Sequence, residues 1–99
     1  MSLCYLDLDK KQLSLLKNII QSQIPDKTVW AYGSRVKGTS EGRSDLDLAV
    51  FNCSGAQIFD LKTALEESSL LISVDVMSWE KIPQEFKSAI KKQYIVLQD

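Results

Sequence analysis

Apolar residues recur along the chain at two different spacings, and the wider spacing predicts helices. The first helix is expected over residues 10–24, where apolar positions return every three or four residues after Asp9 in the N-cap position. A second helix is expected over residues 56–67, after Ser54, and a last one begins at Pro83. The apolar stripes of the three helices are Leu13, Leu16, Ile20 and Ile24; Ile58, Leu61 and Leu65; and Phe86, Ile90 and Tyr94.

Three stretches predict strands, over residues 28–32, 44–52 and 71–77. The first is β-branched and aromatic, and side chains in the second alternate between two faces. Residues 34–43 between the first two strands are polar and are expected to form a loop. Residues 94–97 fit either the end of the last helix or a short terminal strand. The resulting order, α-β-β-α-β-α, predicts an α+β fold in which a small mixed β-sheet packs against helices.

Composition narrows the class of protein without identifying it. The chain of 99 residues is expected to form a single domain over residues 1–99, and its 44% hydrophobic and 25% charged residues are ordinary for a soluble protein. With a net charge of −1 and no basic stripe, direct nucleic-acid binding is not expected. No apolar stretch approaches the ~20 residues that span a membrane and no signal-peptide pattern is present, so we expect a cytoplasmic location.

The residue types available restrict the chemistry. Histidine is absent, which excludes Ser-His-Asp and Cys-His catalytic systems and most zinc sites. The two cysteines, Cys4 and Cys53, show no metal-binding spacing and are expected to be reduced thiols. Chemistry in this chain must therefore use carboxylates, hydroxyls and Lys or Arg side chains, which favours a metal of the magnesium type.

Two aspartates stand out inside the second predicted strand. Asp45 and Asp47 share one face of that strand, with Cα atoms about 6.5–7 Å apart, because side chains alternate along a strand. This spacing suits two Mg²⁺ ions that lie about 3.5–4 Å apart. Leu46 and Leu48 then occupy the opposite face and hold the strand against the core. The alternative is a pair of solvated aspartates on an exposed sheet face.

A third aspartate, Asp75, stands between Val74 and Val76 in the third predicted strand and is expected to be buried there. A buried carboxylate lowers stability unless it is paired or binds a metal. If this strand neighbours residues 44–52, Asp75 completes a cluster of three carboxylates. The alternative is an aspartate on an edge strand or in a salt bridge.

Gly33 and Ser34 end the first strand and provide a candidate anion site. Glycine allows close approach of the backbone to a ligand, and Ser34 adds a hydroxyl and an N–H group. Arg35 and Lys37 follow and could neutralise triphosphate oxygens, although each is equally well explained as a solvated loop cation. Together with the carboxylates, this pattern predicts a site for a metal-bound nucleoside triphosphate.

The remaining aromatic residues are expected to pack in the core. Trp30 and Tyr32 have strand spacing, and Trp79 follows the third strand directly. Stacking of Trp79 on a nucleotide base is the alternative to packing. The lysines of the last helix, Lys87 and Lys91 among them, are expected to form a solvated face.

The string Gly33–Gly38 (GSRVKG), followed by Ser44–Val50 (SDLDLAV), resembles the minimal nucleotidyltransferases, or MNT domains, of the DNA polymerase β-type superfamily. The resemblance covers nearly the whole chain, from the leading helix to the strand with the third aspartate, and implies the nucleotidyltransferase fold. It also implies a set of site residues. Two Mg²⁺ ions would be held by Asp45, Asp47 and Asp75, and the nucleotide would be bound by Gly33, Ser34, Arg35 and Ser44.

The same resemblance implies a reaction. A hydroxyl group attacks the α-phosphate of ATP in line and releases pyrophosphate, and the carboxylate that matches Asp75 can assist deprotonation of that hydroxyl. MNT proteins of this size are typically paired with a HEPN-domain protein, a helical ribonuclease toxin. Some members transfer AMP from ATP to a tyrosine of that toxin.

The length of the chain fits this arrangement, because 99 residues hold a nucleotide site but little that could bind an acceptor. We therefore expect an Mg²⁺-dependent protein adenylyltransferase that acts as the antitoxin of a HEPN-domain partner. One alternative is an antitoxin that neutralises its partner by binding without catalysis. Another is a small-molecule nucleotidyltransferase of the antibiotic-modifying kind, which the absence of an acceptor domain disfavours. A homodimer or a mixed complex is compatible with each.

Overall fold

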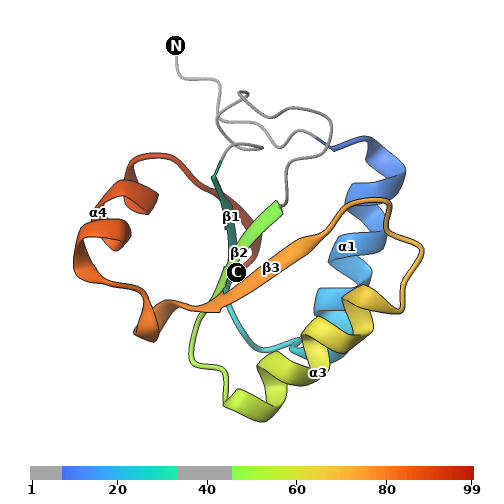
Figure 1. The fold of residues 1–99 in the computed structure, drawn as a ribbon. Helices are drawn as coiled ribbons and strands as arrows, with labels where there is room; N and C mark the ends of the chain where they lie inside the picture. Colours follow the sequence, from blue (N-terminus) through green and yellow to red (C-terminus); the bar gives the residue numbers. More distant parts are fainter. Residues whose placement is uncertain (1–7, 34–45) are drawn as a thin grey trace.

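The computed structural model describes residues 8–33 and 46–99, and this part of the chain forms a β-sheet with helices on both faces (Figure 1). Helices α1 (Lys10–Gln23) and α3 (Gly55–Glu66) lie on one side of the sheet, and α4 (Gln84–Lys92) lies on the other. The strands are β1 (Val29–Tyr32), β2 (Leu46–Val50), β3 (Val74–Ser78) and β4 (Ile95–Gln98), and the short 3₁₀ helix η1 (Trp79–Lys81) leads from β3 towards α4.

The sheet has the strand order β3-β2-β1-β4 and is mixed. Strand β1 runs antiparallel to both of its neighbours, β2 and β4, whereas β2 and β3 are parallel and are connected through α3. The predicted α+β fold with a small mixed sheet is therefore confirmed. Strand β3, which carries Asp75, lies at one edge of the sheet and is a direct neighbour of β2, as the three-carboxylate hypothesis required.

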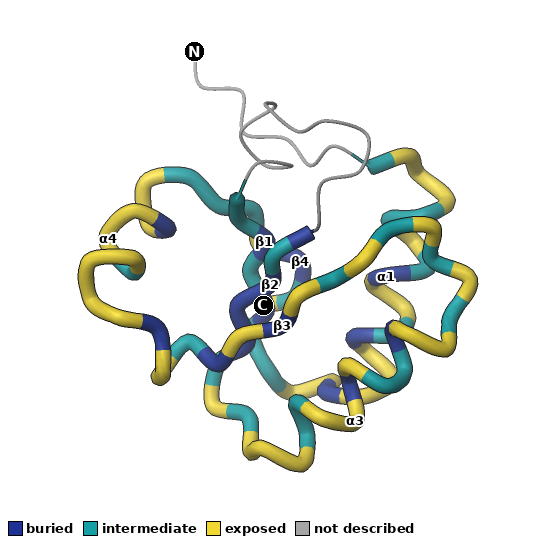
Figure 2. The backbone as a smooth tube through the Cα atoms, viewed as in Figure 1, coloured by how far each residue is buried: buried dark blue, intermediate teal, exposed yellow. Residues whose placement is uncertain are grey.

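The main hydrophobic core lies between the sheet and the pair α1–α3. Leu16 and Ile20 of α1 and Leu61 of α3 are almost completely buried, and they pack with the inward residues of the strands. Figure 2 shows the contrast between the buried central strands β1 and β2 and the largely exposed α4. The strand residues in this core are Val29, Ala31, Leu46, Leu48, Val50, Val76 and Leu97.

Local side-chain hydrogen bonds explain where the first two helices begin. The Asp9 carboxylate accepts a hydrogen bond of 2.8 Å from the Gln12 N–H, and Ser54 and Gln57 form a reciprocal capping box. The observed bounds of α1 and α3 consequently agree with the predicted ranges to within one residue.

The ambiguous C-terminal segment is a strand, β4, so the structure adds a final strand to the predicted order of elements. The Gln98 side chain holds it in place by donating hydrogen bonds to the carbonyls of Ile24, at 2.6 Å, and Lys27, at 2.8 Å. At the other edge, β3 begins at Val74 rather than at residue 71, since the Leu71 N–H instead donates to the Gln12 side chain. None of the described helices is long and apolar enough to cross a membrane.

Candidate active site

Three polar side chains form a row across the face of the sheet that α4 partly covers. The register places Tyr32 of β1 opposite Asp47 of β2, and Asp47 opposite Asp75 of β3. Because cross-strand partners project to the same face of a sheet, the two carboxylates and the phenol are successive neighbours, on strands about 4.7–4.9 Å apart. We call this set the carboxylate–tyrosine row.

The two aspartates of the row differ in burial. Asp47 is half-buried, whereas Asp75 is exposed, so the expectation that Asp75 is buried was wrong. The physical reason is its position, because β3 is an edge strand and the face that carries Asp75 is open to solvent there. Val76 on the opposite face of the strand is buried in the core, which accounts for the apolar sequence around Asp75.

Gly33 lies against Asp47, the middle member of the row, and the position favours glycine. Its φ angle is +90°, and a Cβ atom added to it would overlap Oδ2 of Asp47 and lie 3.3 Å from Cγ of the same residue. Any other residue would have to displace the Asp47 carboxylate. The backbone at the end of β1 is thus in direct contact with a carboxylate of the row, whereas the sequence had suggested only a close approach to a ligand.

Tyr32 was expected to be a packing residue, but it also belongs to the polar row. Burial raises the pKa of its hydroxyl, and the negative charges of Asp47 and Asp75 raise that pKa further. The phenol is therefore neutral at physiological pH and keeps its proton for hydrogen bonding. Its place directly before Gly33 was the only sequence signal that linked it to the site.

Four of the predicted site residues, Ser34, Arg35, Ser44 and Asp45, lie outside the described residues. Within residues 8–33 and 46–99, no group of three or more Asp, Glu, Cys or His side chains is arranged to hold a metal ion. The predicted cluster of three carboxylates therefore stays a prediction. Two of its members, Asp47 and Asp75, are brought together by the sheet.

Comparison with known proteins identifies the family. The model of the polymerase β nucleotidyltransferase family matches residues 8–99. The chain belongs to this family. It is 40% identical over 101 residues to a "Probable protein adenylyltransferase MntA" of Haemophilus influenzae, and the alignment covers 99% of this chain and 89% of that protein. The expected resemblance to a minimal nucleotidyltransferase is therefore confirmed, and nucleotidyltransferase activity with it.

A solved structure supports the fold of this nucleotidyltransferase. A chain from a crystal structure of a toxin–antitoxin with AMP-PNP superimposes with a TM-score of 0.70 at 21% sequence identity. The superposition covers 91% of this chain and 73% of that chain. At this level of identity, the similarity concerns the fold.

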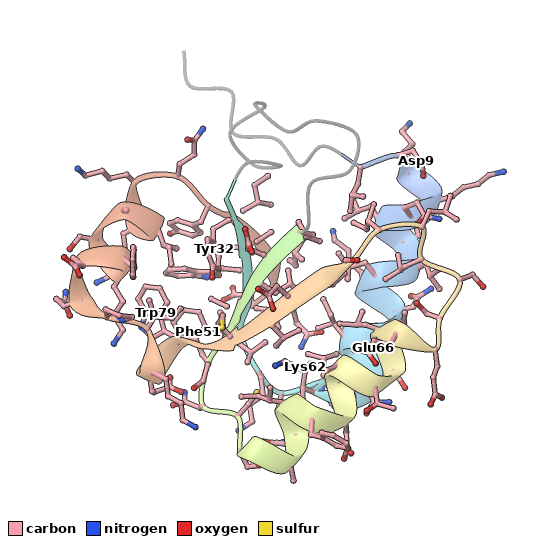
Figure 3. The ribbon with its side chains drawn as sticks, in the orientation of Figure 1. Asp9, Tyr32, Phe51, Lys62, Glu66 and Trp79 are labelled. Atoms are coloured by element: carbon pink, nitrogen blue, oxygen red, sulfur yellow. The ribbon has the colours of Figure 1, made fainter. Side chains whose placement is uncertain are left out.

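An aromatic cluster fills the far end of the same face of the nucleotidyltransferase. Trp30 stacks on Tyr94 with ring centroids 3.9 Å apart and meets Phe51 and Trp79 edge-on at 4.7 and 5.2 Å. Trp79 also stacks on Phe51, so it packs as expected (Figure 3). The Nζ atom of Lys87 lies 5.4 Å from the centroid of the Trp79 ring, where a cation–π contact is favourable.

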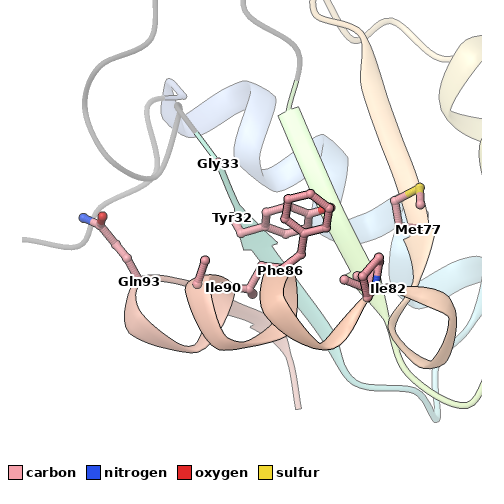
Figure 4. Close-up of a pocket in the computed structure, with 9 residues that line it drawn as sticks. Tyr32, Gly33, Met77, Ile82, Phe86, Ile90 and Gln93 are labelled. Atoms are coloured by element: carbon pink, nitrogen blue, oxygen red, sulfur yellow. The ribbon is translucent and has the colours of Figure 1, made fainter.

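A pocket of about 350 Å³ lies between the carboxylate–tyrosine row and α4. Figure 4 shows Tyr32 from β1, Gly33 directly after that strand, Met77 from β3 and Phe86 from α4 around it. No pattern in the sequence predicts this pocket, because the pocket depends on how α4 packs on the sheet.

The described part of the row fits a hard divalent cation. Carboxylate oxygens are the ligands that Mg²⁺ prefers, and Asp47 and Asp75 provide them from adjacent strands on one face. Asp75 is exposed to solvent and so leaves room for the water ligands that Mg²⁺ usually keeps. Strand β2 is anchored by Leu46 and Leu48 in the core, so Asp47 projects from a rigid element.

Proposed function

We propose that this protein is an Mg²⁺-dependent adenylyltransferase that transfers AMP from ATP to a hydroxyl group of a partner toxin and thereby acts as its antitoxin. The observation that carries the proposal is the cross-strand pairing of Asp47 with Asp75 on one face of the sheet, with Gly33 in contact with Asp47. Support for the kind of transfer comes from the relative named as a probable protein adenylyltransferase. Support for the antitoxin role comes from the similar fold in a toxin–antitoxin structure.

Each site residue has a proposed role. Asp47 and Asp75, with Asp45, are the proposed ligands of two Mg²⁺ ions, which when bound would stabilise negative charge on the attacking and leaving oxygens. The triphosphate is bound by the backbone at Gly33 and by a second group of residues further along the chain. That second group is Ser34, Arg35 and Ser44.

Asp75 is the proposed proton acceptor. It is exposed at the edge of the sheet, so an acceptor hydroxyl can approach it from solvent. The hydroxyl oxygen forms a bond to the α-phosphorus, and the bond from that phosphorus to the bridging oxygen breaks. Pyrophosphate leaves with the electron pair, and the hydroxyl proton passes to Asp75 and on to solvent. The neutral phenol of Tyr32 does not compete for this proton.

The acceptor is proposed to be a tyrosine of a helical HEPN-domain toxin in the cytoplasm, where ATP is available. The family resemblance supplies this identity. Homodimers and mixed complexes both agree with this scheme.

The test is a transfer assay with the protein encoded next to this one and ATP labelled on the α-phosphate. Wild-type protein is expected to label the neighbour, and the variant Asp45→Ala/Asp47→Ala is expected to lose the label. Asp60→Ala is the matched control, because Asp60 is an exposed aspartate on α3, outside the proposed site. A tight complex without label would overturn the catalytic proposal and favour an antitoxin that acts by binding.

A further inference from the structure

The pocket between the sheet and α4 has an apolar interior and an exposed aromatic rim. Its most buried lining residues are Ile82 and Ile90, each 6% exposed. Its most exposed large side chains are Met77, at 41%, and Phe86, at 58%. A volume of about 350 Å³ is small for a ligand site but sufficient for a flat ring system.

The pocket opens directly beside the carboxylate–tyrosine row. Tyr32 belongs to both, so the edge of the row is also a wall of the pocket. Met77 lies two residues after Asp75 on the same face of β3, a distance of about 7 Å along the strand. Gly33, where the triphosphate is proposed to bind, lines the pocket as well. A ligand that fills the pocket therefore has its outer end at the carboxylates.

We propose that this pocket binds the purine base of the nucleoside triphosphate, which rests on the proposed function because it assumes that the phosphates lie at the row. The Tyr32 and Phe86 rings and the polarisable sulfur of Met77 suit the faces of an aromatic base. Among the described lining residues, the Gln93 amide and the Tyr32 hydroxyl are the polar side-chain groups, and they suit the ring nitrogens and exocyclic group of a purine.

The direction of entry favours a base over an aromatic side chain of the acceptor. A nucleotide enters base first and leaves its phosphates at the end of the pocket that Gly33 lines, and Gly33 is next to Asp47. A tyrosine enters with its hydroxyl leading, and that hydroxyl would then meet the apolar residues Ile82 and Ile90 instead of the carboxylates. The acceptor accordingly approaches from the open edge of the sheet at Asp75.

Two variants isolate the contribution of the base. Phe86→Ala removes the exposed ring at the rim, and Ala89→Phe fills the pocket from an exposed position of α4, so neither change touches the core. Phe59→Ala is the matched control, since Phe59 is 69% exposed on α3 and does not line the pocket. Binding of ATP, CTP and inorganic tripolyphosphate, each with Mg²⁺, is measured by titration calorimetry without any partner protein.

Wild-type protein is expected to bind ATP more tightly than CTP, and CTP more tightly than tripolyphosphate. Phe86→Ala and Ala89→Phe are expected to weaken ATP binding by roughly tenfold, the loss that corresponds to one base-stacking contact. Both variants should bind tripolyphosphate as well as wild type does, and Phe59→Ala should leave all three affinities unchanged.

Other outcomes separate the failure of this inference from failure of the proposed function. If ATP and tripolyphosphate bind wild type equally, or if both pocket variants keep full ATP affinity, the base lies elsewhere and the inference is overturned. Loss of transfer to the partner with unchanged ATP affinity in Ala89→Phe would assign the pocket to the acceptor and also overturn it. The proposed function survives these results as long as Asp47→Asn weakens Mg²⁺-dependent binding of tripolyphosphate. Absence of any nucleotide or tripolyphosphate binding by wild type would overturn both.

Discussion

The two faces of the sheet differ in what they are made of, although the same strands form both. The face towards α1 and α3 is a continuous apolar core, whereas the face towards α4 carries the carboxylate–tyrosine row, a pocket and an aromatic cluster. In β2 the division falls between neighbours, because Leu46 and Leu48 are buried in the core while Asp47 lies in the row. Stability and chemistry are thus assigned to opposite faces, so substitutions one residue apart should separate them.

The largest expected effects come from the adjacent pair Asp47 and Leu48. Leu48→Ala leaves a cavity in a fully buried site and is expected to lower the free energy of unfolding by about 2–5 kcal/mol. Asp47→Asn is expected to change that free energy by less than about 1 kcal/mol, because it keeps the shape of a half-buried side chain, while abolishing transfer. Urea unfolding followed by fluorescence measures the first quantity, and the labelled-ATP assay measures the second.

This pair also provides its own controls. Folded Leu48→Ala should retain transfer activity at low temperature, and Asp47→Asn should have an unfolding midpoint no lower than that of the wild type. A large loss of stability in Asp47→Asn would mean that the row supports the fold, and the division between the two faces would not hold.

The backbone conformation of Gly33 and the position of the Asp47 carboxylate depend on each other, because the two groups are in contact. Gly33→Ala places a methyl group against the Asp47 carboxylate at a φ of +90°, and is expected to cost about 1–3 kcal/mol of stability and to reduce Mg²⁺-dependent binding. Gly55→Ala is the matched control, since a Cβ there meets nothing within 4 Å in the first turn of α3, and should be neutral or stabilising by up to about 1 kcal/mol. Thermal unfolding with and without Mg²⁺ compares the two. Equal behaviour of both variants would show that the contact with Asp47 is unimportant.

The sequence predicted those features that depend on neighbours along the chain. The caps at Asp9 and Ser54 are local, so the bounds of α1 and α3 agreed closely with the structure. The pairing of Asp47 with Asp75 depends on which strands become neighbours, and the sequence could state it only as a condition. Gly33 approaches Asp47 across two strands, and no spacing in the sequence records that contact.

The exposure of Asp75 and the role of Tyr32 were missed for a related reason. An apolar run predicts a strand but does not distinguish an edge strand from a central one, and β3 is at the edge. Alternation along the strand places Tyr32 and Ala31 on opposite faces of the sheet, but it does not say which face carries the aspartates. Only the register, with Tyr32 opposite Asp47, shows that Tyr32 shares their face. The position of α4 over that face decides which aromatic residues pack and which line the pocket.

A smaller effect tests whether the carboxylates of Asp47 and Asp75 repel each other in the folded protein. Asp47 and Asp75 are cross-strand partners of like charge, and such pairs are destabilising by up to about 1 kcal/mol. Asp75→Asn is therefore expected to raise the thermal unfolding temperature slightly in the absence of Mg²⁺, and to reduce the stabilisation that Mg²⁺ gives the wild type. Differential scanning fluorimetry with and without Mg²⁺ measures both shifts. If Mg²⁺ stabilises wild type and Asp75→Asn equally, Asp75 is not a ligand.

The smallest expected effect concerns Cys53, a titratable group packed against the apolar face. Burial raises the pKa of its thiol; the nearby Lys27 opposes this shift and Glu80 adds to it. The thiol is thus protonated at a pH where an unfolded cysteine, with its pKa near 9.0, already ionises. Folding stability from this group is unchanged below pH 9 and falls as the pH rises towards the folded-state pKa, because the unfolded chain then binds fewer protons.

Alkylation by iodoacetamide measures this directly in a Cys4→Ser background, where Cys53 is the remaining thiol. The reaction rate at pH 8 is expected to be lower in the folded protein than in urea, and the folded rate should continue to rise above pH 9. Access to the reagent also slows the reaction of a partly buried thiol, but it scales the rate equally at every pH. The shift of the pH profile, rather than the rate itself, therefore reports the environment of Cys53. If the pH profiles in the folded and unfolded states coincide, burial against the apolar face does not raise the pKa of the Cys53 thiol.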